Sequence, residues 1–227
     1  MCDDFEDYDV GMDPGGPWEL DENNGAVEVD DARAVSGTKS VRFNTNAGQY
    51  KSALIAIEGS PFPVTGNAFW GRMMLYITQA ANDGVHWTMI AGEGPDAAHN
   101  NDLASVRYGG QHQKRLMANY WSEPNTSDCW HHSETVIPEG RWACMEWFFD
   151  GPNETMQFYL DGNAIDDLTV VGMGEPNTCI PDATQNNWYF PDFERVAVGW
   201  QSYQDDDARE VWIDDVALAL ARVGCPE

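Results

Sequence analysis

Basic side chains and long apolar runs are both scarce in this chain. Its 227 residues include 12 Lys+Arg against 38 Asp+Glu, which gives a formal net charge of −26. Nucleic acids and anionic membranes bind clustered cations, so this charge argues against both as partners. No stretch of about 18 apolar residues occurs, and a transmembrane helix is therefore not expected. A signal peptide is also missing, and we interpret Met1 before Cys2 as an added start on a mature, processed protein.

Metal-binding cysteine patterns are absent as well. The five cysteines, at Cys2, Cys129, Cys144, Cys179 and Cys225, show no CxxC or Cys/His spacing, which argues against a zinc site. Because the ends of a domain usually lie near each other, we predict a disulfide between Cys2 and Cys225. Cys129 then pairs with either Cys144 or Cys179, and the sequence leaves this choice open. Disulfides are typical of oxidising compartments, so we expect a secreted or extracytoplasmic protein.

Helical periodicity is weak, and strand-forming runs dominate. Aromatic and β-branched residues gather in short runs that are separated by Gly, Pro, Asn and Asp, a pattern typical of a β-sandwich. We predict an all-β protein with one domain over residues 1–227, a monomeric, concanavalin-like jelly roll of two antiparallel sheets with a concave groove. The predicted strands are 51–58, 69–77, 85–91, 104–108, 116–121, 141–149, 155–160, 163–165, 195–200 and 211–220.

Acidic residues stand near both ends of the chain. The opening Asp3-Asp-Phe-Glu6 and the late strand 210–218, which contains Asp214 and Asp215, bring carboxylates together if the two segments pair. Calcium prefers such oxygen ligands. Neighbouring residues of a strand point to opposite faces, so only one of the two late aspartates faces inward, and we favour Asp214.

Signatures of hydrolases are missing. Retaining jelly-roll glycosidases carry two carboxylates on one strand in the pattern Glu-x-Asp-x-x-Glu, which does not occur here. A Gly-x-Ser-x-Gly elbow is also absent. Glu146 stands alone among aromatic residues, and we interpret it as a satisfied, buried or groove-lining polar residue.

Eight short segments, taken in order along the chain, resemble the polysaccharide-lyase-like β-jelly-roll family (cellulose-induced secreted protein type, near the glucuronan lyases). The resemblance implies the jelly-roll fold and a polysaccharide as the partner, with lyase-like chemistry. It also implies one calcium ion, held by Glu6, Ser36, the backbone carbonyl of Lys39, and Asp214. The segments are Asp4-Phe-Glu6, Ser36-Gly-Thr-Lys-Ser40, Val85-His-Trp87, Arg107-Tyr-Gly-Gly-Gln111, Asp128-Cys-Trp130, Trp142-Ala-Cys-Met-Glu-Trp147, Tyr159-Leu-Asp-Gly162 and Trp212-Ile-Asp-Asp-Val216.

Four polar residues on the predicted groove suit a β-eliminating lyase. Such an enzyme neutralises the uronate carboxylate, removes the proton at C5 and protonates the leaving glycosidic oxygen. Arg107, with either Gln111 or Asn119, suits the first task. His86 suits the second, because its ordinary pKa lies near neutrality. Tyr203 suits the third, or both proton transfers if its pKa is lowered.

Further groove residues are predicted to contact the sugar chain. We assign substrate binding to Asn119, Tyr108 and Trp121, and we expect Gly109 and Gly110 to let the chain approach the sheet. Sugar rings stack on exposed aromatic rings, whereas most aromatic residues of a sandwich fill its core. The tryptophan candidates for stacking are Trp87, Trp121, Trp130 and Trp200.

Net charge opposes the lyase hypothesis. A polyuronate is repelled by a chain of net charge −26 unless its groove is locally basic, and Lys114 and Arg115 beside Arg107 are the candidates for such a patch. The alternative hypothesis is a carbohydrate-binding protein without catalysis. That protein needs an open aromatic groove but no convergent base.

Overall fold

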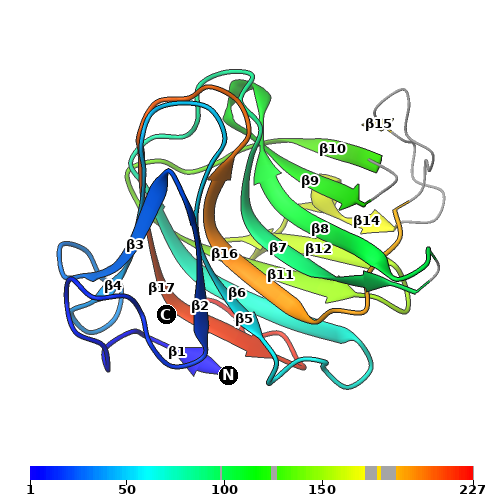
Figure 1. The fold of residues 1–227 in the computed structure, drawn as a ribbon, viewed down its shortest axis with the longest axis horizontal. Coiled ribbons are helices and arrows are strands. Elements are labelled where there is room, and N and C mark those ends of the chain that lie inside the picture. Colours follow the sequence, from blue (N-terminus) through cyan, green and yellow to red (C-terminus); the bar gives the residue numbers. More distant parts are fainter. Residues whose placement is uncertain (98, 124–126, 172–177, 180–187, 227) are drawn as a thin grey trace.

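Two antiparallel β-sheets face each other across a hydrophobic core (Figure 1). The computed structural model describes residues 1–97, 99–123, 127–171, 178–179 and 188–226. Within these residues, no helix is long and apolar enough to cross a membrane. The predicted all-β class with two antiparallel sheets is confirmed.

The first sheet contains nine strands in the described residues. Its main order is β13-β12-β11-β6-β17-β4-β3, while β1 pairs with β17 and β14 pairs with β12. The last strand of the chain therefore lies in the middle of this sheet. The bounds are β1 Cys2–Asp3, β3 Gly25–Asp30, β4 Ser40–Thr45, β6 Ala68–Ile77, β11 Trp142–Asp150, β12 Thr155–Leu160, β13 Asn163–Ala164, β14 Val170–Val171 and β17 Arg209–Ala219.

The second sheet contains eight strands, in the order β15-β10-β9-β8-β7-β16-β5-β2. Two short 3-10 helices, η1 (His112–Lys114) and η2 (Asp166–Leu168), interrupt the connections. The strands are β2 Trp18–Asn23, β5 Lys51–Glu58, β7 Trp87–Asp96, β8 Asp102–Gly110, β9 Arg115–Ser122, β10 Ser127–Val136, β15 Thr178–Cys179 and β16 Arg195–Ser202.

Strands with many polar residues escaped the sequence prediction. β2, β3, β4 and β10 were not expected, and β7 continues through Gly-Glu-Gly-Pro to Asp96 instead of ending near residue 91. Glycine at position 94 has a packing reason, since a Cβ there would lie 1.9 Å from the carbonyl oxygen of Asp192. A glycine inside a strand commonly marks such a close backbone approach.

Aromatic rings from both sheets fill the space between them. Phe149 of the first sheet is fully buried, meets Phe69 edge-on at 5.7 Å and stacks on Phe193 at 5.6 Å. Trp87 and Trp200 of the second sheet stack at 4.9 Å, and both are 0% exposed. These two tryptophans therefore belong to the core, and the prediction that they stack on a sugar is wrong.

The end of the chain is fastened to the first sheet by a disulfide that differs from the predicted one. Cys225 bonds to Cys144 of β11, and Cys2 is a free, exposed thiol. The expected pairing of the first and last strands does occur, with Cys2 opposite Ala217. However, the chain runs on beyond β17 and returns over β11, so Cys225 is not beside Cys2.

The same disulfide excludes a bond between Cys129 and Cys144. Cys129 is itself disulfide-bonded, and its backbone partner across β10 and β15 is Cys179. The side chain of Cys179 lies outside the described part of the structure.

Glu146 is the buried anchor of the C-terminal segment. It is 0% exposed and accepts hydrogen bonds from Nη2 of Arg222 at 2.7 Å and from the amide of Gly224 at 2.8 Å. The guanidinium of Arg222 also lies over the ring of Tyr159, 3.9 Å from its centroid. The interpretation of Glu146 as a satisfied buried polar residue is confirmed.

Truncation of Phe149 tests the sandwich core. We expect Phe149→Ala to lower the free energy of unfolding by about 3–5 kcal/mol, because the cavity cannot be filled from either sheet. Urea unfolding followed by tryptophan fluorescence measures this loss. Val171→Ala, at a side chain that is 46% exposed, is the control and should change stability little. Equal effects of the two substitutions would contradict this description of the core.

Loss of Arg222 tests the C-terminal anchor. Arg222→Ala leaves the Glu146 carboxylate buried without its cation, and we expect a loss of about 2 kcal/mol, since the guanidinium is itself partly exposed. Glu146→Gln, combined with Arg222→Ala, should recover part of this loss because no charge then stays buried. A denaturant-based double-mutant cycle with no coupling between the two positions would refute the anchor.

Candidate functional site

Strand alternation sorts the side chains of the second sheet into a core face and an open face. On β8, Ser105 and Arg107 project to the open face, whereas Val106 and Tyr108 enter the core. The hydroxyl of Tyr108 donates to the carbonyl of Leu168, and the side chain is 1% exposed. The prediction that Tyr108 contacts substrate is therefore wrong, because its neighbour Arg107 occupies the open face.

Arg107 is the centre of a polar cluster on the open face. Its Nη1 donates to the hydroxyl of Tyr203 at 3.0 Å, and its Nε donates to Oγ of Ser105 at 2.8 Å. The guanidinium lies over the ring of Trp121, 5.4 Å from the centroid. Its nearest carboxylate oxygen in the described residues belongs to Glu93, at 3.9 Å from Nη2. Arg107 thus has one long ion pair, to a carboxylate that Arg195 binds as well.

Tyr203 follows the end of β16 and turns its phenol toward Arg107. The backbone amide of Tyr203 donates to the carbonyl of His86 at 3.1 Å, which fixes the two residues side by side. The phenol oxygen lies 2.6 Å from Oε1 of Gln201 and 3.1 Å from Oγ1 of Thr88. Burial raises the pKa of the Tyr203 phenol above its ordinary value, although the positive charge of Arg107 opposes this shift. The phenol is therefore protonated at neutral pH.

His86 precedes β7 and packs its ring against that of Tyr203, with 4.7 Å between centroids. Burial lowers the pKa of His86 to about 3, and the charges of Arg107 and His132 act in the same direction. Nε2 of His86 is buried and has no hydrogen-bond partner within the described residues. The imidazole is therefore neutral over the physiological pH range and can accept a proton.

A hollow of about 400 Å³ lies beside His86. Asp128 and Trp130 of β10 line it, and the amide of Asn119 donates to Asp128 at 2.6 Å. Burial raises the pKa of Asp128, an effect that the Asn119 hydrogen bond and the Arg107 charge oppose. The remaining lining residues are His86, Gln111, His112, Met117, His132 and Gln204.

The structure brings most of the predicted site residues to one region of the open face. His86 and Arg107 both contact Tyr203. Gln111 lies in the same hollow as His86, and its amide donates to the carbonyl of Gly84. Trp121 flanks Arg107. Asn119 is 1% exposed and meets the hollow through Asp128.

Four residues of this region were missed. Asp128 and His132 on β10 line the hollow, while Glu93 and Gln201 flank Arg107 and Tyr203. The alternation of Asp128, Trp130 and His132 is a period-two signal that identifies one face of a strand.

Two glycines beside Arg107 have a structural role that differs from the predicted one. A Cβ on Gly109 would lie 1.9 Å from the carbonyl oxygen of Trp87, and a Cβ on Gly110 would lie 2.2 Å from the Trp87 ring. These glycines admit the backbone and ring of Trp87.

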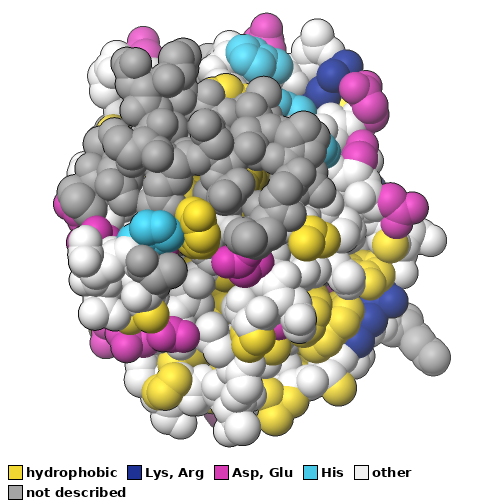
Figure 2. Space-filling view, turned by 90° about the vertical axis from the view of Figure 1, so that its right-hand side faces the viewer, with side chains coloured by type: hydrophobic (Ala, Val, Ile, Leu, Met, Phe, Trp, Pro, Cys, Tyr) yellow, Lys and Arg dark blue, Asp and Glu magenta, His cyan; other side chains and the backbone are white. Residues whose placement is uncertain are grey.

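Ion pairs neutralise most of the cations near the open face. Lys114 bonds to Glu139 at 2.8 Å, and Arg115 bonds to Glu134 at 3.0 Å, so the expected basic patch around them does not form. Figure 2 shows acidic side chains spread over the described part of one face, with histidines near its top and hydrophobic side chains in its lower half.

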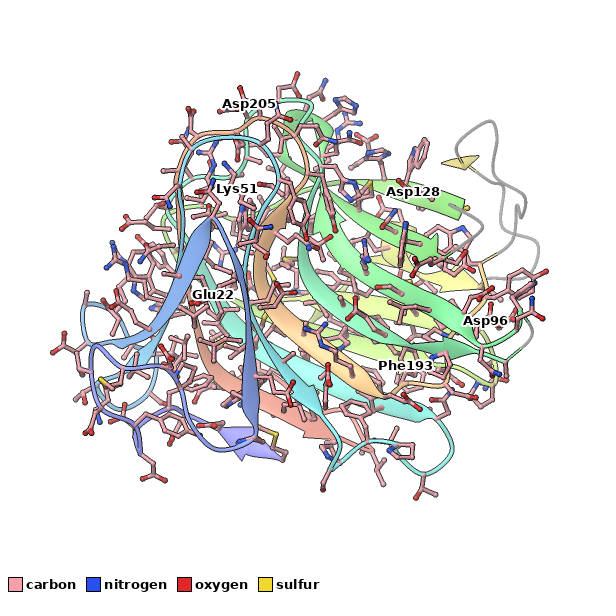
Figure 3. All side chains as sticks on the ribbon, in the orientation of Figure 1. Glu22, Lys51, Asp96, Asp128, Phe193 and Asp205 are labelled. Carbon is pink, nitrogen blue, oxygen red and sulfur yellow. A yellow bond between two sulfur atoms is a disulfide. The ribbon has the colours of Figure 1, made fainter. Side chains whose placement is uncertain are left out.

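A second hollow, of about 600 Å³, lies beyond Glu93 on the same sheet. Arg195 is paired there with Glu58 at 2.9 Å and with Glu93, and Glu194 adds a third carboxylate. Arg107, which also contacts Glu93, is less closely paired than Arg195 and can therefore meet an anionic ligand. Figure 3 shows Asp128 on β10, where it lines the first hollow, and Asp96 at the far end of β7.

The predicted calcium ligands lie around one turn but do not share one point. Glu6 accepts the amides of Thr38 and Lys39 at 2.7 and 2.6 Å. Asp214 accepts the amides of Val35 and Ser36 at 2.7 and 3.3 Å.

The remaining two predicted ligands also have protein partners. The hydroxyl of Ser36 donates to Asp215 at 2.8 Å, and Nζ of Lys39 donates to the carbonyls of Glu6 and Tyr8 at 2.8 and 2.7 Å. The side chains of Glu6, Ser36 and Asp214 are thus already hydrogen-bonded within the protein, and as arranged they do not fit the predicted metal site. The ammonium of Lys39 lies beside them, on the carbonyl oxygens of Glu6 and Tyr8.

The fold is a jelly-roll sandwich with polar and aromatic side chains on one open sheet face, an architecture that hosts many unrelated functions. The chain belongs to the polysaccharide-lyase-like family, whose Cip1-like core-domain profile matches residues 17–221. This confirms the resemblance on which the fold and the partner were predicted. No curated protein matches the sequence at a significant level.

Solved structures show the same fold. The cellulose induced protein Cip1 is 24% identical, and the similarity covers 100% of both chains with a TM-score of 0.68. The binding domain of botulinum neurotoxin serotype D/C is 10% identical, with a TM-score of 0.52 over 89% of this chain and 43% of the neurotoxin chain.

A titration of His86 tests the electrostatics of the site. We expect its imidazole to stay neutral down to about pH 3. Because the unfolded chain takes up this proton near the ordinary pKa of 6.5, falling pH favours unfolding from there downward. Arg107→Gln should raise the His86 pKa, whereas Lys114→Gln should not. Nitrogen-15 NMR of the imidazole measures both, and a wild-type midpoint near 6.5 would contradict the buried environment.

Proposed function

We propose that this protein cleaves a uronic-acid-containing polysaccharide by β-elimination on the open face of its second sheet. The observation that carries the proposal is the convergence of Arg107, Tyr203 and His86. A fixed cation and a neutral imidazole both contact one protonated phenol, that of Tyr203.

Each residue has a separate role in the reaction. Arg107, assisted by Gln111, neutralises the uronate carboxylate and so makes the proton at C5 more acidic. His86 accepts this proton at its imidazole ring. The electron pair of the C5–H bond forms the C4–C5 double bond, and the C4–O bond breaks. Tyr203 donates its proton to the departing glycosidic oxygen.

The protonation states favour this assignment. A base has to be unprotonated and an acid protonated before the reaction, and burial drives His86 and Tyr203 to those states. A bound uronate brings a negative charge beside His86, which raises its basicity when the substrate is present. Trp121 and Trp130 flank the centre and offer ring surfaces to neighbouring sugars.

We further propose that the protein acts outside the cytoplasm as a monomer. The bond between Cys144 and Cys225 is typical of oxidising compartments, where polymeric substrates are also met. No step of the proposed reaction requires a metal ion.

A carbohydrate-binding protein without catalysis is the second candidate. The net charge of −26 and the carboxylates around Arg195 favour it, because both repel a polyuronate. A binding protein requires the aromatic open face and Arg107 but no proton transfer.

Uronate polysaccharides incubated with the protein test the lyase. Formation of an unsaturated product, followed by its ultraviolet absorbance, is the expected result. Arg107→Ala should abolish turnover, and His86→Ala or Tyr203→Phe should lower the rate by at least ~10²-fold. Lys114→Ala is the control and should leave the rate unchanged.

The same variants separate the two candidates. If the wild type forms no unsaturated product while Arg107→Ala weakens glycan binding, the protein is a binding protein. Turnover that survives in both His86→Ala and Tyr203→Phe would refute the assigned roles.

A further inference from the structure

The turn at residues 33–39 is the junction of three distant segments. The side chain of Glu6 binds it from the N-terminal loop, and Asp214 binds it from β17. Lys39 reaches from the turn back to that loop, where its Nζ contacts the carbonyl oxygens of Glu6 and Tyr8 at 2.8 and 2.7 Å. The loop thus turns two carbonyl oxygens toward one positive charge.

The two carbonyl oxygens around the Lys39 ammonium are arranged as in a metal-binding loop, with the ammonium in the position of the ion. Loops that bind hard metal ions direct backbone carbonyl oxygens at the ion. An ammonium group has three N–H donors and meets the same oxygens by hydrogen bonding. Two of the three donors of Lys39 are used in this way.

The carboxylates of the junction accept backbone amides. Oδ2 of Asp214 accepts the amides of Val35 and Ser36, and Oδ1 accepts the amide of Asp215 at 2.7 Å. Successive amide groups directed at one anion supply part of the positive field that a metal ion would otherwise supply.

The chain uses the same device a second time, at Lys51 (Figure 3). Lys51 is 0% exposed, and its Nζ donates to the carbonyl oxygens of Asn46, Asp206 and Asp207 at 3.1, 2.8 and 2.9 Å. A lysine that ties irregular backbone together through carbonyl oxygens is therefore a recurrent solution in this molecule.

We propose that the ammonium of Lys39 is the resident cation of the N-terminal junction and takes the place of a divalent metal ion there. A calcium ion bound to the same carbonyl oxygens would lie a few ångströms from the ammonium. At such a distance, like charges repel strongly even at an effective dielectric constant of about 20. The junction is accordingly independent of metal, and its stability depends on Lys39.

Thermal unfolding with and without a chelator tests this proposal. The wild type should melt at the same temperature in EGTA and in millimolar calcium chloride, and elemental analysis should find no stoichiometric calcium. Lys39→Met removes the ammonium but keeps the aliphatic chain. It should lower the melting temperature by several degrees, equally in chelator and in calcium.

Lys114→Met is the matched control, because the ammonium of the exposed Lys114 pairs with the partly exposed carboxylate of Glu139 and contacts no backbone carbonyl in the described residues. It should shift the melting temperature by less than the Lys39 substitution. Lys39→Gln, which keeps a neutral donor, should be intermediate. Hydrogen exchange should show faster exchange in residues 1–12 of Lys39→Met than in the wild type, and this local readout holds even if the global shift is small.

Two results would overturn the proposal. One is a wild-type melting temperature that falls by several degrees in EGTA together with about one calcium ion per chain. The other is a Lys39→Met protein with unchanged melting and unchanged exchange in the N-terminal loop. Neither measurement involves a substrate. The proposed lyase activity is therefore tested independently, by the formation of unsaturated product.

Discussion

The pleat of the second sheet is the constraint on which the site depends. Alternation forces Arg107 and its register partners Ala91 and Asn119 onto one face, while Val106 and Tyr108 enter the core. Small residues on the open face, such as Ala91 opposite Ala197, leave space above the sheet beside the long side chains of Arg107 and Arg195. One geometric rule therefore produces both the packed interior and the polar surface, and a shift of one residue in register would exchange them.

Burial acts on the site in a way that composition does not reveal. The same removal of water that lowers the pKa of His86 raises the pKa of Tyr203, because in each case the charged form is penalised. Arg107 keeps its charge since guanidinium is not deprotonated in proteins. Three neighbouring side chains thus become a neutral base, a neutral acid and a permanent cation.

Sequence patterns predicted the class of fold and most of the residues on the open face. Apolar and aromatic runs located strands such as Lys51–Glu58, and the first and last strands pair as expected. The errors arose where a tertiary path decides the outcome. Cys225 lies beyond the end of β17, so its partner depends on how the C-terminal segment turns, and that turn is guided by the contact of Arg222 with buried Glu146. Tyr108 was assigned to the wrong face by neglect of alternation, and Asp128 belongs to a strand whose polar composition concealed it.

The central position of β17 has a consequence for the order in which the molecule is made. β17 separates β4 from β6, so these two strands, which lie early in the chain, have no shared neighbour until the final segment has been synthesised. Contacts of such long sequence separation are slow to form, and unpaired strand edges are prone to aggregation in the meantime. During translation, the half-built sheet therefore exposes two edges that only the last strand can cover. The Cys144–Cys225 disulfide can form only after β17 has been inserted, so its presence indicates that the first sheet is complete.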